Sequence, residues 1–175
     1  MEVAVLAGGC FWCTEAVFQR LKGVIEVKPG FSGGHVKNPA YKEVITQSTG
    51  HAEVSHITFN PDVISYKRLL EVYFATHDPT TLNRQGADVG THYRSAIFCT
   101  SVEQYNTALE FISILTKEDV FEDPIVTEVV NFEAFYPAEN YHTDYYNQNS
   151  EKSFCRMVIN PKIEKLEKYF KETLK

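Results

Sequence analysis

Residues 3–13 read VAVLAGGCFWC, and this stretch decides the fold. The small and apolar run from Val3 to Ala7 predicts a buried strand. Two glycines follow it, and residues without side chains suit the close approach of a strand to a helix. That helix is expected from Cys10 to about Leu21. The stretch therefore predicts a strand, a tight turn and a helix whose first turn carries Cys10.

Further elements follow from the spacing of apolar residues. Strands are expected at residues 24–31, 53–59, 94–99 and 125–130. Helices are expected at residues 65–75, from Thr100 with a capping box to Glu103, and from Asn160 with Pro161 at its first position. Residues 131–153 lack clear periodicity and predict an irregular segment. This order favours an α+β fold: a two-layer sandwich with a mixed, ferredoxin-like central sheet and a long irregular C-terminal region. No linker divides residues 1–175, so we expect a single catalytic domain.

The composition narrows the functional classes. The 175 residues contain 17 Lys+Arg and 23 Asp+Glu, a formal net charge of −6. A binder of nucleic acid or of anionic membranes would carry a basic surface, so neither partner is expected. No apolar run approaches the roughly 20 residues that span a bilayer. With no basic leader before the first strand, we expect a cytoplasmic protein. We also expect a monomer. In that compartment a close cysteine pair is more often catalytic or metal-binding than structural.

Cys10 is the strongest candidate nucleophile. At the first turn of a helix its sulfur faces unpaired backbone N–H groups and the positive end of the helix dipole. Such positions can lower a cysteine pKa from about 8.5 to roughly 3.5–7.5. The alternative is a buried structural cysteine, because free cysteines are commonly buried. Phe11 and Trp12 favour a pocket wall for an apolar group beside a polarised centre.

Glu53 occupies an unusual position at the start of a predicted strand. By alternation its side chain shares one strand face with Ser55, Ile57 and Phe59. Because this face carries the large hydrophobic residues, we expect Glu53 to point inward or toward a cleft. On this pattern alone, a salt-bridged residue at the strand end is the alternative.

Five motifs then occur in a recognisable order. They are Gly9-Cys10-Phe11-Trp12 followed by Glu15, Tyr41-Lys42-Glu43-Val44, Gly50-His51-Ala52-Glu53-Val54, Gly90-Thr91-His92-Tyr93-Arg94-Ser95 and Tyr141-His142-Thr143-Asp144-Tyr145. From about Val3 to Lys168 the chain resembles peptide methionine sulfoxide reductases of the A class, which reverse methionine oxidation. The resemblance implies action on the S epimer of methionine sulfoxide, free or within proteins.

The resemblance also implies a role for each matching residue. Cys10 would attack the sulfoxide sulfur and become a sulfenic acid, while Glu53 donates the proton that the departing oxygen needs. A carboxyl among aromatic walls has its charged form disfavoured, which retains that proton. The implied substrate-binding residues are Phe11 and Trp12 around the S-methyl group, Tyr41 and Tyr93 as O–H donors to the oxygen, Asp88 at the polar end, and His142 and Tyr145 lining the site. Neither a metal nor a resident cofactor is implied.

The step that regenerates Cys10 stays open. The chain departs from the commonest family pattern at Cys13, where glycine is frequent, and at His92, where glutamine is frequent. Cys155 lies roughly where many members carry a resolving cysteine, but residues 156–159 look strand-like and would fix it. Cys13 is near Cys10, although one helical turn need not suit a disulfide. Cys155, Cys13 and an external thiol are therefore all candidates, with thioredoxin, glutaredoxin or a small thiol as reductant.

The fourth cysteine has a simple interpretation, and two other functional classes are alternatives. Cys99, in an expected core strand, is most simply structural. A thioredoxin-like disulfide exchanger would use Cys10 and Cys13 without needing Glu53. A zinc-binding module would take those two cysteines and two of the histidines His35, His51 and His56. His51 and His56 fall on opposite faces of an extended strand, which disfavours zinc.

Overall fold

The computed structural model describes residues 1–175, with the element bounds as follows. The strands are β1 (Glu2–Ala7), β2 (Val24–Ser32), β3 (Ala52–Phe59), β4 (Arg84–Gln85), β5 (Asp88–Val89), β6 (Ala96–Cys99), β7 (Glu128–Asn131) and β8 (Tyr136–Pro137). The α-helices are α1 (Phe11–Phe18), α2 (Tyr41–Val44), α3 (Tyr66–Thr76), α4 (Val102–Lys117), α5 (Tyr145–Asn149) and α6 (Asn160–Tyr169). Short 3-10 turns are η1 (Thr91–Tyr93), η2 (Asn140–His142) and η4 (Lys171–Thr173), and η3 (Cys155–Ile159) is a π-helical turn that leads into α6.

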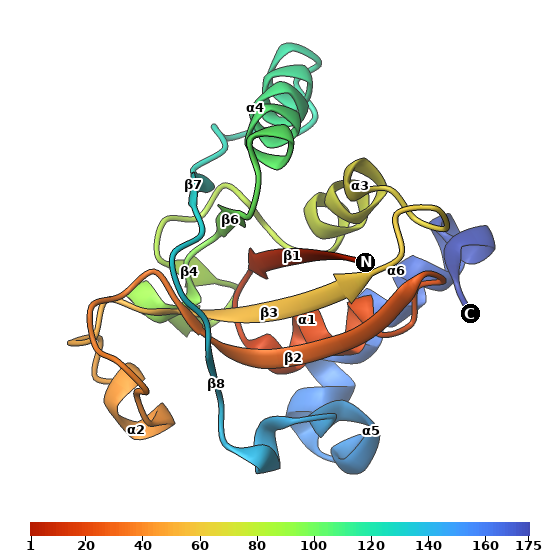
Figure 1. The fold of residues 1–175 in the computed structure, drawn as a ribbon. Coiled ribbons are helices and arrows are strands. Elements are labelled where there is room, and N and C mark those ends of the chain that lie inside the picture. Colours follow the sequence, from red (N-terminus) through yellow and green to blue (C-terminus); the bar gives the residue numbers. More distant parts are fainter.

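Six strands form one mixed sheet in the order β7-β6-β1-β3-β2-β8 (Figure 1). Neighbouring strands run antiparallel except β6 and β7, which are parallel. The strands β4 and β5 pair separately as a small hairpin. The predicted α+β class and mixed sheet are therefore confirmed. None of the helices combines the length and the apolar character that crossing a membrane requires.

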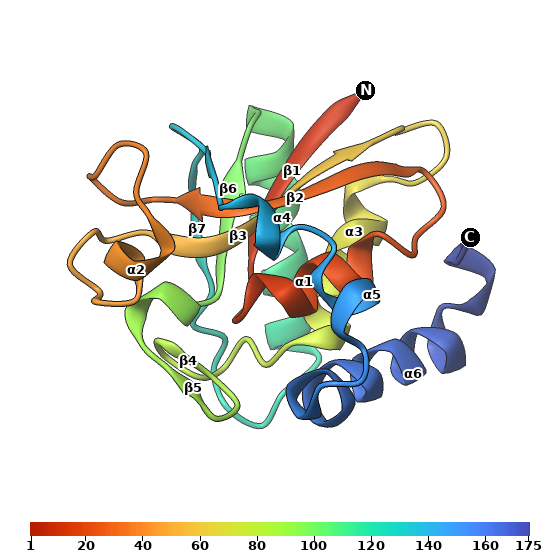
Figure 2. The same cartoon turned by 90° about the horizontal axis from the view of Figure 1, so that it is seen from below.

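Side chains that alternate along the strands give the sheet two different faces. One face, with Leu6, Ile57 and Ile97, packs against the helices in a large apolar cluster to which α1, α3, α4 and α6 contribute. The opposite face forms a smaller cluster that is covered by Phe132 and Phe135 from the connection between β7 and β8. Figure 2 shows α5 and α6, in blue, beside α1. The C-terminal third of the chain thus returns to the helix that follows β1.

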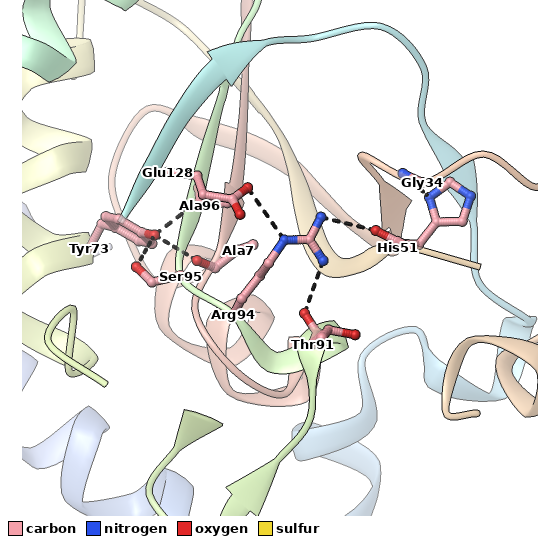
Figure 3. Close-up of polar contacts among 10 residues, drawn as sticks. Ala7, Gly34, His51, Tyr73, Thr91, Arg94, Ser95, Ala96 and Glu128 are labelled. Atoms are coloured by element: carbon pink, nitrogen blue, oxygen red, sulfur yellow. Dashed lines mark hydrogen bonds and ion pairs between the residues drawn. The ribbon is translucent and has the colours of Figure 1, made fainter. Parts of the chain in front are cut away.

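Polar contacts fix two of these helices on the sheet. Tyr73 of α3 donates its phenolic hydrogen to the backbone oxygen of Ala7 (2.6 Å) and lies 3.0 Å from the hydroxyl of Ser95 (Figure 3). Thr14 of α1 and Ser55 of β3 form a buried hydrogen bond of 2.7 Å between their hydroxyls. Because Ser55 and Glu53 lie on the same face of β3, this bond also holds α1 over Glu53.

Several predicted boundaries are wrong at the ends of elements. The helix α1 ends at Phe18, and Leu21 instead pairs with Leu174 in an isolated β-bridge. The cap of α4 is Ser101 rather than Thr100, since the Ser101 hydroxyl accepts the backbone N–H of Gln104 (3.1 Å). The segment predicted to be irregular contains β8, η2 and α5.

The predicted strand-like run at residues 156–159 is also wrong. These residues are helical, and Asn160 continues the helix with φ −53° and ψ −43° instead of capping it. The reason lies in a helical spacing: Cys155, Ile159, Ile163 and Leu166 are all buried. Positions four, four and three residues apart lie along one helix face, so tertiary packing overrides the β-propensity of the short apolar run.

Candidate active site

The turn from β1 into α1 places Cys10 at the start of the helix. Cys10 is the N-cap residue, with φ −63° and ψ 129°, and it is 8% exposed. The preceding Gly9 has φ +90°, a backbone conformation that favours glycine. A Cβ at position 9 would also lie 2.6 Å from Cγ of Gln85. The sharp turn that presents the Cys10 sulfur therefore requires glycine at position 9.

Glu53 takes over the capping of α1. The Cys10 side chain makes no capping hydrogen bond, and the backbone N–H of Phe11 donates to Oε1 of Glu53 at 3.2 Å. One orphan N–H of the helix start is thereby satisfied from β3, by a residue 42 positions along the chain. The other carboxyl oxygen, Oε2, is buried without a hydrogen-bond partner. One carboxyl oxygen of Glu53 thus caps the helix, and the other has no hydrogen bond and remains free beside Cys10.

The environment of Glu53 keeps it protonated at neutral pH. Its side chain is 1% exposed, and burial raises the pKa of Glu53 to about 8. The N–H of Phe11 lowers this pKa, whereas the charges of Asp88 and Cys13 raise it. A carboxyl group with a pKa near 8 is mostly neutral at pH 7 and holds a proton that it can donate.

The lowered pKa expected for Cys10 is wrong in this resting structure. Burial raises the pKa of Cys10 well above its usual value, and a hydrogen bond to Cys13 and the charge of Glu53 raise it further. The N–H of Trp12 acts in the opposite direction. The pKa of Cys13 is lowered, first by the Cys10 hydrogen bond and then, against burial, by the charge of Lys162. Desolvation outweighs the helix dipole at Cys10, so ionisation is disfavoured at Cys10 and favoured at Cys13.

Two tyrosines from separate segments meet beside these groups. Tyr41 begins α2 and Tyr93 ends η1, and both side chains pack against the apolar cluster that contains Cys10 and Phe11. Burial and the charge of Glu53 raise the pKa of Tyr41 to about 12, and the same causes raise the pKa of Tyr93. Both side chains therefore remain neutral O–H donors. Asp88 in β5 is half-buried, and burial raises its pKa as well.

An aromatic wall extends from the first turn of α1. The Trp12 ring stacks on Tyr145 with centroids 3.7 Å apart and planes inclined by 7°. The Trp12 indole N–H donates to Nδ1 of His142 at 3.0 Å. The His142 ring in turn lies 5.1 Å from Phe11 and 4.7 Å from Tyr41, centroid to centroid. The structure therefore brings together five of the residues that the resemblance assigned to the site: Phe11, Trp12, Tyr41, His142 and Tyr145.

The protonation of His142 follows from its contacts. Burial lowers the pKa of His142, so the ring is neutral at pH 7. Because Nδ1 accepts the Trp12 N–H, the ring carries its proton on Nε2. That nitrogen is buried and has no hydrogen-bond partner within the chain. The ring therefore offers an unused N–H donor among the aromatic side chains.

The four cysteines are free, and three of them share one apolar cluster. Cys155, in η3, is fully buried with Cys10 and Cys13. Burial raises the pKa of Cys155, and the charge of Cys13 raises it further. Cys99 ends β6 in the large cluster on the helix side of the sheet.

The sequence analysis assigned no role to two further ionisable residues, the buried Glu15 and the partly buried Lys162. Glu15 of α1 accepts the backbone N–H of Asp144 at 3.0 Å. Lys162, near the start of α6, donates to the backbone oxygen of Thr76, and burial lowers its pKa. A glutamate inside a short and otherwise apolar helix was a visible signal for the first. Nothing in the local sequence distinguishes Lys162 from the other lysines of its helix.

His51, one of the three histidines considered as zinc ligands, has other partners. Nδ1 of His51 accepts the backbone N–H of Gly34 (3.0 Å), and Nε2 donates to the backbone oxygen of Val36 (2.6 Å). Figure 3 shows His51 beside Gly34. Both ring nitrogens are thus engaged by the backbone, which leaves none for a metal ion.

Comparison with known proteins points to one family. The family model described as peptide methionine sulfoxide reductase matches residues 2–174. Peptide methionine sulfoxide reductase MsrA of Saccharolobus solfataricus is 55% identical over 175 residues, covering 100% of this chain and 98% of the relative. The enzyme of Sulfolobus acidocaldarius is 56% identical over 170 residues, covering 97% and 96%.

Comparison with solved structures agrees with the family match. The crystal structure of reduced Mxr1 from Saccharomyces cerevisiae superposes with a TM-score of 0.80 at 32% identity, covering 88% of each chain. Mxr1 has also been crystallised in complex with Trx2. That structure has a TM-score of 0.56 at 23% identity and covers 82% of this chain and 84% of the other.

Proposed function

The chain belongs to the peptide methionine sulfoxide reductase family, and we propose that Cys10 is its nucleophile and Glu53 its proton donor. It is a peptide-methionine (S)-S-oxide reductase, an enzyme that reduces methionine sulfoxide to methionine. One observation carries the assignment of roles. A neutral carboxyl group, fixed by the first N–H of α1, keeps a free oxygen beside the buried sulfur of Cys10.

The first chemical step moves two protons. Cys10 passes its proton to the hydrogen-bonded sulfur of Cys13 as the resulting thiolate attacks the sulfoxide sulfur. Glu53 donates its proton to the sulfoxide oxygen, which leaves the substrate sulfur as hydroxide while a bond forms between that sulfur and the Cys10 sulfur. The hydroxide then attacks the Cys10 sulfur, and the bond between the two sulfurs breaks to release methionine. Two electrons pass from the Cys10 sulfur to the substrate. The net products are methionine and a Cys10 sulfenic acid, which carries the oxygen atom and the proton from Glu53.

The neighbouring side chains suit the two ends of a methyl sulfoxide. Tyr41 and Tyr93 provide neutral O–H donors for an oxygen that gains negative charge in the transition state. Phe11 and Trp12 provide apolar surface for the S-methyl group. Exchanging the methyl group and the oxygen would leave the phenols unpaired, which accounts for selection of the S epimer. Asp88, His142 and Tyr145 would complete the site around the remainder of the substrate.

We further propose that Cys13 resolves the sulfenic acid. Cys10 and Cys13 are the N-cap and third residues of α1, and their sulfurs are within hydrogen-bond reach. Attack of the Cys13 thiol on the sulfenic sulfur forms the Cys10–Cys13 disulfide and releases water. Cys155 lies in the same apolar cluster and is the second candidate. Its complete burial argues against a first attack from Cys155 without movement of η3.

An external dithiol would then return the enzyme to its starting state. Mxr1 is known in complex with Trx2, and we extend that kind of partner to this chain: thioredoxin, with glutaredoxin or a small thiol as alternatives. The substrates would be oxidised proteins and free methionine sulfoxide. Thioredoxin-like disulfide exchange remains the second function, but it would leave Glu53 and the two phenols without a use.

Mass spectrometry after one turnover tests these roles together. The reduced enzyme is mixed with one equivalent of a methyl sulfoxide, alkylated and digested. The wild type should contain a Cys10–Cys13 disulfide, Cys10→Ser should yield no methionine, and Cys13→Ser should accumulate sulfenic acid on Cys10. Cys155→Ser should retain the Cys10–Cys13 disulfide, and Cys99→Ser serves as the control. A Cys10–Cys155 disulfide in the wild type would contradict the choice of Cys13, and full turnover in Cys10→Ser would contradict the nucleophile.

A further inference from the structure

Glu15 is a buried carboxylate that the proposed chemistry does not use. It lies on α1, three residues after Trp12, so both side chains emerge on the same side of the helix. Its Oε2 accepts the backbone N–H of Asp144 at 3.0 Å, across 129 positions of sequence. Asp144 has φ 57° and ψ 33°, a left-handed conformation, and is the residue from which α5 begins. The carboxylate therefore fixes the backbone at a sharp turn.

The side chains around this turn form the wall against Trp12. Tyr145 follows Asp144 directly and stacks on the Trp12 ring at 3.7 Å. His142 precedes Asp144 by two residues, and its ring accepts the Trp12 indole N–H at 3.0 Å. One anchoring bond from α1 thus holds the short segment that supplies both neighbours of Trp12. Arg20, just after α1, also donates to Asn147 (3.0 Å) and Tyr146 hydrogen-bonds Asn160, but these contacts hold α5, whereas Glu15 fixes the turn before it.

The backbone N–H groups near the Glu15 carboxyl group partly offset the effect of its burial. Burial raises the pKa of Glu15 to about 7, while the backbone N–H groups of Asp144 and Tyr145 lower it. Hydrogen bonds from backbone N–H groups to an ionised carboxylate are stronger than those to a neutral amide. An apolar side chain would leave the Asp144 N–H without its acceptor at a partly buried site, which is unfavourable.

We propose that Glu15 is a positioning residue for the substrate pocket: by anchoring Asp144 it holds His142 and Tyr145 against Trp12 and so preforms the wall that receives the methyl sulfoxide. The inference rests on the proposed function, because it takes Trp12, His142 and Tyr145 to line the substrate site. Since Glu15 contacts neither Cys10 nor Glu53 by a hydrogen bond, its loss should weaken substrate binding more than the chemical step.

Trp12 allows a direct test, because it is the only tryptophan of the chain. Its fluorescence, and the quenching of that fluorescence by acrylamide, report on the wall without any turnover. In Glu15→Gln and Glu15→Ala we expect stronger quenching and red-shifted emission, with a larger change in the alanine variant. With a methyl sulfoxide, KM should rise roughly tenfold, while kcat stays within about threefold of the wild type.

Thr14→Val is the matched control. It removes another buried hydrogen bond of α1, the one to Ser55, and leaves the Asp144 anchor in place. Its quenching should match the wild type, because the segment against Trp12 keeps its anchor. Wild-type quenching and KM in Glu15→Gln, or equal changes in Thr14→Val, would overturn the proposal. If the wild type itself failed to reduce the sulfoxide, the proposed function would fail, while quenching would still decide whether Glu15 orders the wall.

Discussion

At the scale of single residues, the most important feature of the site is that Glu53 is protonated at pH 7. The carboxyl group is neutral at pH 7 because burial outweighs the N–H of Phe11 that favours its ionised form. A neutral Glu53 does not oppose the formation of a thiolate on Cys10, whereas an ionised one would. The same burial that delays ionisation of Cys10 thus supplies the acid that its reaction requires.

Glu53→Gln should lower kcat by about 10² to 10⁴-fold with little change in KM. The amide retains an oxygen that can accept the Phe11 N–H, so α1 stays capped, but it has no acidic proton to give to the sulfoxide oxygen. Steady-state kinetics with a methyl sulfoxide would measure the effect. Glu43→Gln is the control, because Glu43 accepts the N–H of Ala40 at the start of α2 in a similar capping role on the surface. Unchanged kcat in Glu53→Gln would show that another group is the acid.

The pH dependence of the reaction follows from the pKa of Glu53. The proposed reactive form has Glu53 protonated, and its pKa is about 8. As pH rises through 8 the fraction of protonated Glu53 falls, so kcat/KM should fall as well, and this limb should be missing from Glu53→Gln. Rates measured between pH 6 and 10 with the first turnover isolated would test it. A rate that rises through pH 8 would contradict this prediction. It would mean that the reactive enzyme has already lost a proton.

At the scale of elements, the spacing of apolar residues predicted which way a side chain points, but not which residue it contacts. Alternation along β3 correctly predicted that Glu53 points inward, because a strand fixes the direction of each side chain locally. The use of Glu53 as the cap of α1 depends on how α1 crosses β3, and no local pattern carries that information. The raised pKa of Cys10 has the same origin: the position at a helix start is visible in the sequence, but the depth of burial is not.

The C-terminal helix shows the opposite kind of error. Residues 156–159 were predicted as extended from a short apolar run, although Cys155 and Ile159 already stand at helical spacing with Ile163. A short apolar run cannot distinguish a strand from a buried helix face, and the longer window decides. The consequence matters for Cys155, because it is buried in a helical turn rather than placed before a strand.

The cap of α4 gives a prediction about stability. The Ser101 hydroxyl accepts the N–H of Gln104, and little of α4 is buried apart from Gln104 and Ala108, so the helix depends on its cap more than a buried helix does. Ser101→Ala should lower the free energy of unfolding by about 1 kcal/mol, and Ser101→Gly by only a few tenths. Urea unfolding would measure both. Equal effects of alanine and glycine would contradict capping by Ser101.

At the scale of the whole molecule, Arg94 ties together the segments that carry the site. Its guanidinium donates to the backbone oxygens of Thr91 (2.9 Å) and Gly50 (3.0 Å) (Figure 3). It also reaches Glu128 of β7 at 3.4 Å. Thr91 begins the turn that ends in Tyr93, and Gly50 lies just before the strand that carries Glu53. The phenol and the acid are therefore positioned by one buried cation that follows Tyr93 in the sequence.

Arg94→Ala should both destabilise the protein and slow the reaction. The Arg94 side chain is 12% exposed, so removing it takes two charged hydrogen bonds from partly buried backbone oxygens, at a cost of about 1.5–3 kcal/mol for each bond lost. Arg94→Lys should recover only part of this, because an ammonium group cannot reproduce the planar fork that spans Thr91 and Gly50. Glu128→Gln should change stability by less than about 1 kcal/mol, since Glu128 is 48% exposed and such ion pairs contribute little. Urea unfolding and kcat/KM of the three variants test the idea. If Glu128→Gln were as damaging as Arg94→Ala, the ion pair to β7, and not the bridge from Tyr93 to Glu53, would be the contact that matters.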